Sequence, residues 1–514
     1  MSTTYLKRAV TAVVTAGLTL VSTAAAEGSA YEAPLERAGG EVLAGQYIVV
    51  LKNQAKGTEV AQRHKVSATS VYSHALSGFA ATLSPAQLKT VRADRTVAYV
   101  VPDGVVRALG KPTPEPPRVK PSGTRRTGPV IDRNGAASTT PRAVQASAPW
   151  GLDRIDQRTR NRDGQYRYVA TGSGVTAFVL DTGIQASHNQ FGGRVIQGYD
   201  AIGDGRGTND CYGHGTQVAG VIGGATYGVA KQVRLVPVRV LNCDGTGTSS
   251  AVIAGVDFVT GARSGPSVAN MSLGGGYTKA LNDAVSASIA SGVTYTVAAG
   301  NFNGDACTLS PASVPAALTV GASDVLDRRA SFSNWGPCVD LFAPGEKIPS
   351  ASIGSSTATA TSSGTSLASP HVAGLAALYL QVAPTATTAT VSSVLLNAAV
   401  PDVLTDPAGS PNRLARKWTG TMPNGRAAFQ EPDGTFWHQA GTGTITASLE
   451  GTAGTDQDLY LWWWDGNAWQ AVAGSASASA SERVVLSGRS GYFTLMVENY
   501  AGAGTYDLWL SRPS

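Results

Sequence analysis

The chain has 514 residues, enough for about three domains of ordinary size, and 42% of them are hydrophobic, which excludes wholesale disorder. The formal net charge of +5 is small for this length and argues against a nucleic-acid-binding protein. The charge is unevenly spread: residues 1–142 hold 18 Lys and Arg against 9 Asp and Glu, and residues 143–514 hold 22 against 26. A basic N-terminal part is therefore joined to a mildly acidic remainder.

Residues 1–26 have the pattern of a secretory signal peptide. Lys7 and Arg8 precede an apolar run from Ala9 to Val21, and Ala24–Ala26 supply small residues for cleavage. The run is shorter than the roughly 20 residues that cross a bilayer. A buried N-terminal helix is the alternative, but the run has no amphipathic period. We expect a secreted, extracellular product without membrane contact once the signal is removed.

A small α+β domain is predicted over residues 27–107, with its core in 46–107. Its predicted elements are strands over 46–51 and 97–101 and a helix over 86–94, which begins after Ser84 and Pro85. Residues 108–142 are rich in Pro, Gly, Ser and Arg and read as an extended linker that proteases can cut.

Residues 143–418 alternate strand-like and helix-like segments, which predicts an α/β domain with a parallel sheet between helices. The predicted strands cover 175–180, 235–240, 268–271 and 293–298, and the predicted helices cover 251–260, 280–290 and 367–381. In this architecture, reactive groups collect at the carboxyl ends of the strands.

Residues 419–514 have a different character and predict a small antiparallel β-sandwich. Its predicted strands cover 444–449, 459–464, 483–486, 492–497 and 505–510. Trp462, Trp463 and Trp464 place alternate rings on opposite faces of a strand. One face is expected in the core; the other is either an exposed aromatic patch for a protein or polysaccharide or a plain requirement of folding.

Four cysteines, Cys211, Cys243, Cys307 and Cys338, lie in the middle of the chain. An even number in an exported protein favours disulfides. Three pairings are open, and spacing does not choose among them. A zinc site is the alternative, but the chain has neither a CxxC nor a CxxH motif.

Three short motifs supply a carboxylate, an imidazole and a hydroxyl at the ends of predicted elements. Asp181 follows the strand over 175–180, His214 opens a helical stretch, and Ser366 opens the helix that ends near Gln381. A serine needs a base to take its proton, a histidine can be that base, and an aspartate can hold the histidine in the correct tautomer. Each residue alone has an ordinary structural explanation, but the three together predict nucleophilic catalysis of acyl transfer.

The order Asp, His, Ser is that of subtilisin. The chain resembles the subtilisin-like serine proteases (subtilases), and within them the proteinase K and aqualysin group. The matching stretches are 179–184, 213–216, 270–275, 298–301 and 363–374. Residues 46–107 resemble the family's inhibitory propeptide, and residues 440–510 resemble the prepeptidase-type C-terminal β domain of secreted bacterial proteases.

The resemblance implies catalytic roles at matching positions. Ser366 would be the nucleophile, His214 the base, Asp181 its orienting partner, and Asn301 the side-chain donor to the oxyanion. The peptide would be sandwiched as an added strand between two segments, and a further segment would wall the pocket before the scissile bond. These segments comprise Gly245, Thr246 and Gly247, then Ser272, Leu273 and Gly274, and Ala298, Ala299 and Gly300 as the wall. They contain no acidic residue, so an apolar or aromatic preference is expected.

Three positions depart from the family pattern. Gln217 replaces a second histidine, Leu367 replaces the methionine after the nucleophile, and Leu309 replaces a tyrosine near the pocket. Because methionine there can oxidise to a polar sulfoxide, we expect better resistance to peroxide.

The same resemblance implies structural calcium at one or two sites and the bridges Cys211–Cys243 and Cys307–Cys338, but no catalytic cofactor. Calcium takes oxygen ligands. The first site would use the carbonyls of Pro315 and Ala317 with Asp340. The second would use Asp153, Asp156, Gln157, Asp163 and Gln165.

The sequence therefore predicts a monomeric endopeptidase that acts on proteins and peptides, is held inactive by its own propeptide, and processes itself. The mature chain would start near Ala143, after a first cut near the end of the small domain and later trimming. The alternatives are a catalytically dead binding protein and an esterase or amidase.

Overall fold

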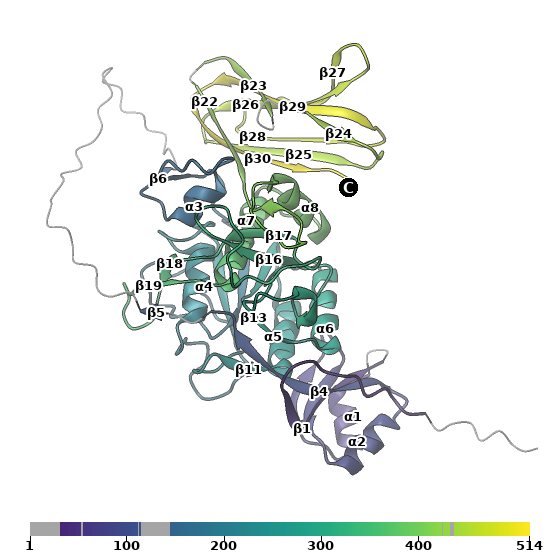
Figure 1. Ribbon diagram of the computed structural model, residues 1–514. Coiled ribbons are helices and arrows are strands. Elements are labelled where there is room, and N and C mark those ends of the chain that lie inside the picture. Colours follow the sequence, from purple (N-terminus) through teal and green to yellow (C-terminus); the bar gives the residue numbers. More distant parts are fainter. Residues whose placement is uncertain are drawn as a thin grey trace, which may run out of the picture.

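The computed structural model describes residues 31–52, 55–110, 113–114, 144–423, 425–431 and 436–513. The predicted signal peptide, most of the predicted linker and Ala143 lie outside them. Figure 1 shows an N-terminal α+β part and a C-terminal β part at opposite ends of a central α/β part. No helix among the described residues is both long and apolar enough to cross a membrane.

Nine strands of the described chain form the central sheet, in the order β20-β21-β17-β16-β14-β12-β8-β10-β9. All neighbours are parallel except β20 and β21, which confirms the predicted α/β class. The strands are β8 (Thr176–Asp181), β9 (Tyr199–Asp200), β10 (Arg234–Arg239), β12 (Ser267–Met271), β14 (Thr294–Ala298), β16 (Leu318–Ser323), β17 (Leu341–Pro344), β20 (Val400–Pro401) and β21 (Arg413–Leu414).

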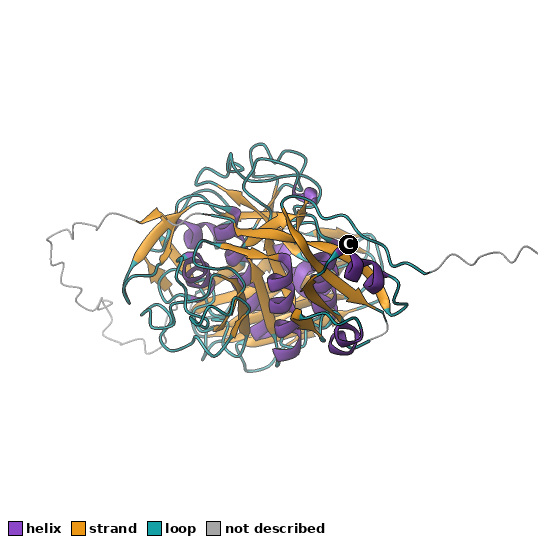
Figure 2. Ribbon diagram, turned by 90° about the horizontal axis from the view of Figure 1, so that it is seen from below, coloured by secondary structure: helices purple, strands orange, loops and turns teal. Residues whose placement is uncertain are grey.

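Helices cover both faces of this sheet because its strands are apolar on both sides. Along β8, Ala177 and Val179 pack in one core cluster, and Phe178 and Leu180 pack in another. The first cluster includes α4 (His214–Gly223), α7 (Thr365–Val382) and α8 (Thr388–Ala398), and the second includes α5 (Ser249–Ala262) and α6 (Lys279–Ala290). Figure 2 shows helices beside the strands, with many loops toward the outside.

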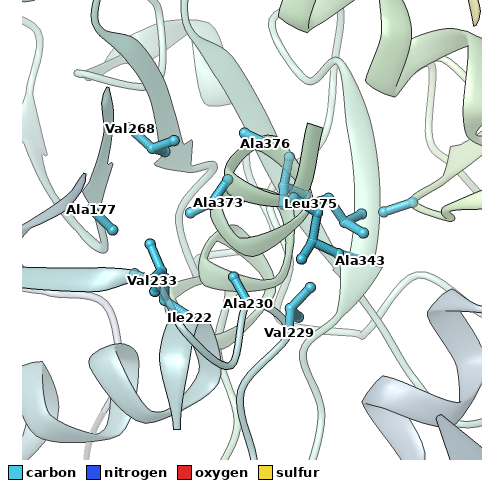
Figure 3. Packing of buried hydrophobic residues seen from close by; sticks show 14 of the residues in the cluster. Ala177, Ile222, Val229, Ala230, Val233, Val268, Ala343, Ala373, Leu375 and Ala376 are labelled. Carbon is cyan, nitrogen blue, oxygen red and sulfur yellow. The ribbon is translucent and has the colours of Figure 1, made fainter. Parts of the chain in front are cut away.

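The small residues of α7 let this helix lie in the middle of the first cluster. Ala373 and Ala376 face Val268 and neighbouring side chains in Figure 3, and both alanines are fully buried. The helix carries Ser366 at its N-terminal end, so close packing of its body holds that end against the sheet.

The N-terminal part is an antiparallel sheet in the order β2-β3-β1-β4 with two helices. Its elements are β1 (Val42–Leu51), α1 (Gly57–Arg63), β2 (Ala68–Tyr72), β3 (Gly78–Thr82), α2 (Pro85–Arg92) and β4 (Val97–Ala108). Helix α2 begins as predicted, with a capping box between Ser84 and Gln87 and Pro85 in the first turn. Strand β4 extends beyond this part into the central part (Figure 1).

The C-terminal part is a sandwich of two antiparallel sheets, β22-β30-β25-β28 and β23-β29-β26-β27, with β24 paired to β29. The predicted all-β sandwich is confirmed. Its strands are β22 (Trp418–Met422), β23 (Ala427–Glu431), β24 (Trp437–Gln439), β25 (Ile445–Gly451), β26 (Asp456–Trp464), β27 (Trp469–Ser475), β28 (Ser481–Leu486), β29 (Gly491–Ala501) and β30 (Gly504–Ser511).

This sandwich is joined to the central part by a buried ion pair and a shared core. Lys417 Nζ lies 2.7 Å from Asp507 Oδ1, and neither side chain has exposed surface. Asp507 Oδ2 also accepts hydrogen bonds from the main-chain N–H groups of Val169 and Ala170. Trp509 on β30 packs against Tyr379 of α7. The two parts therefore form a continuous packed interface.

The remaining described elements are short. They are β5 (Thr113–Pro114), β6 (Val144–Ala146), α3 (Trp150–Ile155), β7 (Gln165–Arg167), β11 (Thr246–Thr248), β13 (Leu273–Gly276), the 3₁₀ turn η1 (Ala306–Thr308), β15 (Leu309–Ser310), β18 (Ile348–Ala351) and β19 (Thr359–Ser362). Of these, β11 and β13 matter most for the site, since both pair with the end of β4.

Candidate active site

The fold brings Asp181 and His214 into direct contact. Asp181 ends β8 and His214 begins α4, and His214 Nδ1 lies 2.8 and 2.9 Å from the two Asp181 carboxylate oxygens. Both side chains are fully buried. Burial disfavours the imidazolium, but the Asp181 carboxylate outweighs it, so the pKa of His214 lies above its ordinary value. Gly213 precedes the histidine with φ of +101°, a conformation that favours glycine.

Ser366 and His214 both face Gly110, which lies just beyond the end of β4. A methyl group placed on Gly110 would lie 2.7 Å from Ser366 Oγ and 3.6 Å from His214 Nε2. Neither atom makes a hydrogen bond within the described residues. Their free polar atoms therefore point at the same stretch of main chain.

Asn301 binds the main-chain carbonyl of Leu109, the residue before Gly110. Its Nδ2 donates to the Leu109 carbonyl oxygen at 2.8 Å. Its Oδ1 accepts from the N–H and the hydroxyl of Thr365, each at 2.9 Å, which fixes the orientation of the amide. A methyl group on Gly364 would lie 2.6 Å from that carbonyl oxygen and 2.8 Å from Ser366 Oγ, so a glycine leaves room where these groups meet.

Two strands hold the chain that leads to this point. Thr246, Gly247 and Thr248 of β11 pair antiparallel with residues 105–107, and Leu273, Gly274 and Gly275 of β13 pair antiparallel with residues 106–108. Two further main-chain bonds continue the ladder, from Ala108 N to Gly245 O at 2.9 Å and from Leu109 N to Ser272 O at 3.1 Å. The segment is thus bound as the middle strand of three, two residues beyond the predicted domain end at 107.

The predicted wall segment lies close to this strand. Ala298 and Ala299 are buried, and Gly300 adopts φ of +109°. A methyl group on Gly300 would lie 2.3 Å from Asn334 Nδ2 and 2.8 Å from Leu309 Cδ1, and one on Gly274 would lie 3.2 Å from Leu109 Cδ1. The Leu109 side chain therefore packs against the main chain at Gly274, where a larger residue would crowd it.

The N-terminal part also binds α5 and α6; the contact with α6 is the Tyr99 hydroxyl, which donates to Asp283 at 2.6 Å. The Asp257 carboxylate on α5 accepts the main-chain N–H groups of Ser73, His74 and Ala75 at 2.6–3.1 Å. Asp103, which is 2% exposed, accepts the N–H and hydroxyl of Ser250 in the first turn of α5. Carboxylates near a helix N-terminus are stabilised by its N–H groups. The N-terminal part is therefore anchored to α5 at two places, the loop between β2 and β3 and the middle of β4.

The two departures near the nucleophile are buried. Leu367 is fully buried with Val221 and Ile348. Gln217 is fully buried in α4, where its main-chain carbonyl accepts from Ser350 and its Oε1 accepts from Ser362. Among the residues that the structure describes, the Asp181–His214 pair makes no hydrogen bond with either of them.

The residues of the first calcium hypothesis lie together. Pro315, Ala317 and Asp340 line one hollow of about 440 Å³ beside α8. Burial raises the pKa of Asp340 to about 6, and the hydrogen bond from the Thr319 N–H and the charge of Arg413 offset this only in part. A carboxylate and main-chain carbonyls are the oxygen ligands that a hard cation takes, but Arg413 and Arg512 line the same hollow and oppose a cation there.

The residues of the second calcium hypothesis meet, but they fit a cation less well. Both carboxylate oxygens of Asp153 accept main-chain N–H groups, from Asp163 and Gly164. Asp163 is itself paired with Arg167 at 2.5 Å. Asp156 keeps one buried oxygen without a partner. Among the residues described, no three His, Cys, Asp or Glu side chains are placed to hold a metal ion.

The four cysteines form two disulfides, Cys211–Cys243 and Cys307–Cys338, which is the pairing that the resemblance implied. The first lies between the loop before α4 and the loop after β10, near the catalytic histidine candidate. The second ties η1 to the loop before β17.

Sequence reasoning assigned no role to Asn270 or Thr365, although both support the site. Asn270 Nδ2 donates to Ser272 Oγ, and that hydroxyl donates to the Ser366 carbonyl. Asn270 Oδ1 accepts from Ser369 and Thr296. Asn270 lies in the stretch 270–275 and Thr365 in the stretch 363–374, both of which match the family pattern. Their place in these stretches is the sequence feature that could have identified them.

Comparison with known proteins agrees with this geometry. The sequence model of the subtilase family, peptidase S8, matches residues 172–432, and that of peptidase inhibitor I9 matches residues 46–109. The chain belongs to the subtilase family. It is a subtilase serine endopeptidase with an inhibitor-type propeptide, so the binding-protein and esterase alternatives are set aside.

The relatives of this subtilase include secreted bacterial enzymes. It is 53% identical to an "Extracellular serine proteinase" of Thermus sp. (strain Rt41A) over 346 residues, 67% of this chain and 76% of that protein. It is 41% identical to "Alkaline serine exoprotease A" of Vibrio alginolyticus over 451 residues, 87% of this chain and 73% of that protein. A crystal structure of a cold-adapted subtilisin-like serine proteinase matches with 53% identity and a TM-score of 0.51, covering 52% of this chain and 98% of that one.

Proposed function

We propose that Ser366, His214, Asp181 and Asn301 carry out peptide-bond hydrolysis through an acyl-enzyme. Ser366 Oγ attacks the carbonyl carbon while His214 Nε2 takes its proton, and Asp181 stabilises the resulting imidazolium. Asn301 Nδ2 and the main-chain N–H of Ser366 stabilise the oxyanion. His214 then gives the proton to the leaving amine, and water releases the acyl group by the same steps in reverse.

The observation that carries this proposal is the position of the Leu109–Gly110 peptide. Its carbonyl oxygen is 2.8 Å from Asn301 Nδ2, and Ser366 and His214 face the following residue. This is the arrangement of a bond about to be cut. We therefore assign the first self-processing cut to Leu109–Gly110. The later trimming near Ala143 remains a proposal about residues outside those described.

The bound segment also supports a specificity. Leu109 would occupy the pocket before the scissile bond, and it is 4% exposed. Val106, three residues earlier, is 1% exposed between β11 and β13, whereas Arg107 is exposed beside Glu41. We infer apolar preferences at the first and fourth positions before the cut and tolerance at the third. Protein and peptide substrates would bind by the same added-strand pairing.

The propeptide would inhibit the enzyme until it is degraded, because it fills the cleft and binds α5 and α6. We place the inhibitory domain in residues 27–107 with its tail to Leu109, the catalytic domain in 143–418 and the β-sandwich in 419–514. The signal-like residues 1–26 and the extracellular relatives support secretion. A monomer is expected.

Calcium at the site of Pro315, Ala317 and Asp340 is the structural cofactor that we propose. The ion would neutralise a buried carboxylate and hold the loop before β16 to the strand start at Leu341. The Asp340→Asn variant should unfold at a lower temperature than the parent, and a chelator should no longer change its unfolding temperature. Equal chelator sensitivity in both proteins would contradict the assignment.

Casein hydrolysis tests the function. The parent should degrade casein and lose this activity on treatment with a covalent serine-directed inhibitor, and Ser366→Ala should be inactive. Undiminished hydrolysis by Ser366→Ala would refute the proposal.

A further inference from the structure

The carboxylate of Asp210 connects the two elements that carry the histidine and its aspartate partner. It lies in the loop before α4, four residues ahead of His214. Its Oδ1 accepts from the Thr182 hydroxyl and from the N–H groups of Tyr212 and Gly213 at 2.7–3.0 Å. Its Oδ2 accepts from the N–H and hydroxyl of Thr216 at 2.9 and 2.7 Å.

Both hydroxyls that donate to Asp210 also accept a hydrogen bond from a main-chain N–H group of the other element. Thr182 Oγ1 accepts from the N–H of Gly215 at 2.9 Å, and Thr216 Oγ1 accepts from the N–H of Gln185 at 3.0 Å. Thr182 and Gln185 follow Asp181 at the end of β8, while Gly215 and Thr216 follow His214 in α4. The chain after β8 and the first turn of α4 are therefore cross-linked through one carboxylate.

The N-terminus of α4 has no other side-chain cap in its own sequence. Gly213 occupies the N-cap position and has no side chain to offer. The first N–H groups of a helix need acceptors from outside the helix. Asp210 supplies them for Gly213 and Thr216, on either side of His214 in the chain, and so fixes the turn from which the imidazole projects.

Charge acts in the same direction as geometry. Two carboxylates favour the charged form of His214: Asp181 at the end of β8 and Asp210 in the loop before α4. Arg239 at the end of β10 also lies near Asp210; it is paired with Asp204 and is close to Asp200. Burial raises the pKa of Asp210, and the five donated hydrogen bonds counter it by stabilising the carboxylate.

We propose that Asp210 is a positioning residue for the general base: it holds the His214 ring against Asp181 and supplies a second negative charge to the imidazolium formed during catalysis. This inference rests on the proposed role of His214. It assigns a function to a residue that the triad motifs do not include. It predicts an effect on turnover rather than on substrate binding, because the hydrogen bonds of Asp210 in the described part of the chain go to Thr182, Tyr212, Gly213 and Thr216.

The test compares Asp210→Asn with the parent and with Asp204→Asn. The control also neutralises a carboxylate of the loop before α4, but its carboxylate bonds to Arg239 rather than to α4. Active enzyme is counted by titration with a covalent serine-directed inhibitor, so that misfolded protein does not enter kcat. For Asp210→Asn we expect kcat to fall at least about 10-fold with KM within about 2-fold, and the acid limb of kcat/KM to move to lower pH by at least about half a unit.

For Asp204→Asn, kcat and the acid limb should match the parent. A loss of folded protein alone, with normal kcat and an unmoved acid limb in the Asp210→Asn molecules that are active, would overturn the proposal and leave Asp210 as a structural cap. If Asp210→Asn does not process itself, the His214 ring is titrated by NMR in the uncut Ser366→Ala precursor with and without Asp210→Asn. An unchanged pKa there would also overturn it. The proposed function fails on a different result, namely a Ser366→Ala protein that still hydrolyses casein, so the two failures can be told apart.

Discussion

Asp507→Asn should destabilise this subtilase strongly, although residue 507 lies far in sequence from the catalytic motifs. The native carboxylate serves Lys417 with one oxygen and the N–H groups of Val169 and Ala170 with the other. An asparagine has one carbonyl oxygen, so it can accept either from Lys417 or from the two main-chain N–H groups. Its NH₂ group then faces the donors that are left. Lys417 then loses its hydrogen-bonded carboxylate while it remains fully buried, and Asp156 is left as a carboxylate that acts on it through charge.

The magnitude follows from this burial. Exposed ion pairs contribute about 0–1 kcal/mol, but removing one partner of a buried pair costs about 3–5 kcal/mol because the remaining charge is uncompensated. We expect a loss near the lower end of this range, about 3 kcal/mol, because Asp156 still compensates part of the Lys417 charge. The effect should include the central part, because Trp509 on the same strand packs against Tyr379.

The assay is denaturant unfolding followed by tryptophan fluorescence, in the Ser366→Ala background to prevent self-digestion. Asp465→Asn is the matched control, because Asp465 is an exposed turn carboxylate whose hydrogen-bond acceptor oxygen an asparagine can replace. The control should stay within about 0.5 kcal/mol of the parent. An Asp507→Asn protein that unfolds within about 1 kcal/mol of the parent would refute the reasoning and show that the sandwich is loosely attached.

The remaining predictions concern the site and its surroundings. Asn301→Ala should lower kcat with little change in KM, by about 10²–10³-fold, a loss known for removal of such a donor in subtilisin itself; an unchanged kcat would exclude the assigned role. Leu367→Met should lose activity in dilute peroxide faster than the parent, because a methionine beside the nucleophile can oxidise, and equal inactivation would contradict this. Burial lowers the pKa of His371 to about 4, whereas an unfolded histidine titrates near about 6.5. Between these values the unfolded chain binds a proton that the native chain does not, so stability falls as pH falls, and His371→Asn should weaken that dependence in unfolding titrations at pH 4–7.

Much of the central part could be predicted from sequence because its signals are local. Helices α5, α6 and α7 lie within about two residues of the predicted ranges, since runs of small and apolar residues between strand-like segments set both elements. The meeting of Asp181 and His214 could be predicted because Asp181 ends a parallel strand and reactive groups collect at the carboxyl ends of such strands.

Other features depend on contacts that sequence patterns do not show. Strand β4 was predicted to end at 101, but it continues to Ala108 because β11 and β13 offer hydrogen-bonding edges far away in the chain. Strands β22, β23, β24 and β27 were missed because their alternation is weak. Lys417 and Asp507 are 90 residues apart, and nothing local in either segment predicts their pairing. The role proposed for Asp210 depends on its hydrogen bonds with Thr182 and Thr216, which the sequence does not show.

The most direct test of the account is the C-terminus of the released propeptide. Intact-mass analysis of freshly expressed parent should find a fragment that ends at Leu109, and the Ser366→Ala precursor should remain uncut at that bond. A fragment that ends elsewhere in the parent, or the same cut in Ser366→Ala, would contradict the claim that this catalytic site hydrolyses the Leu109–Gly110 peptide bound within it.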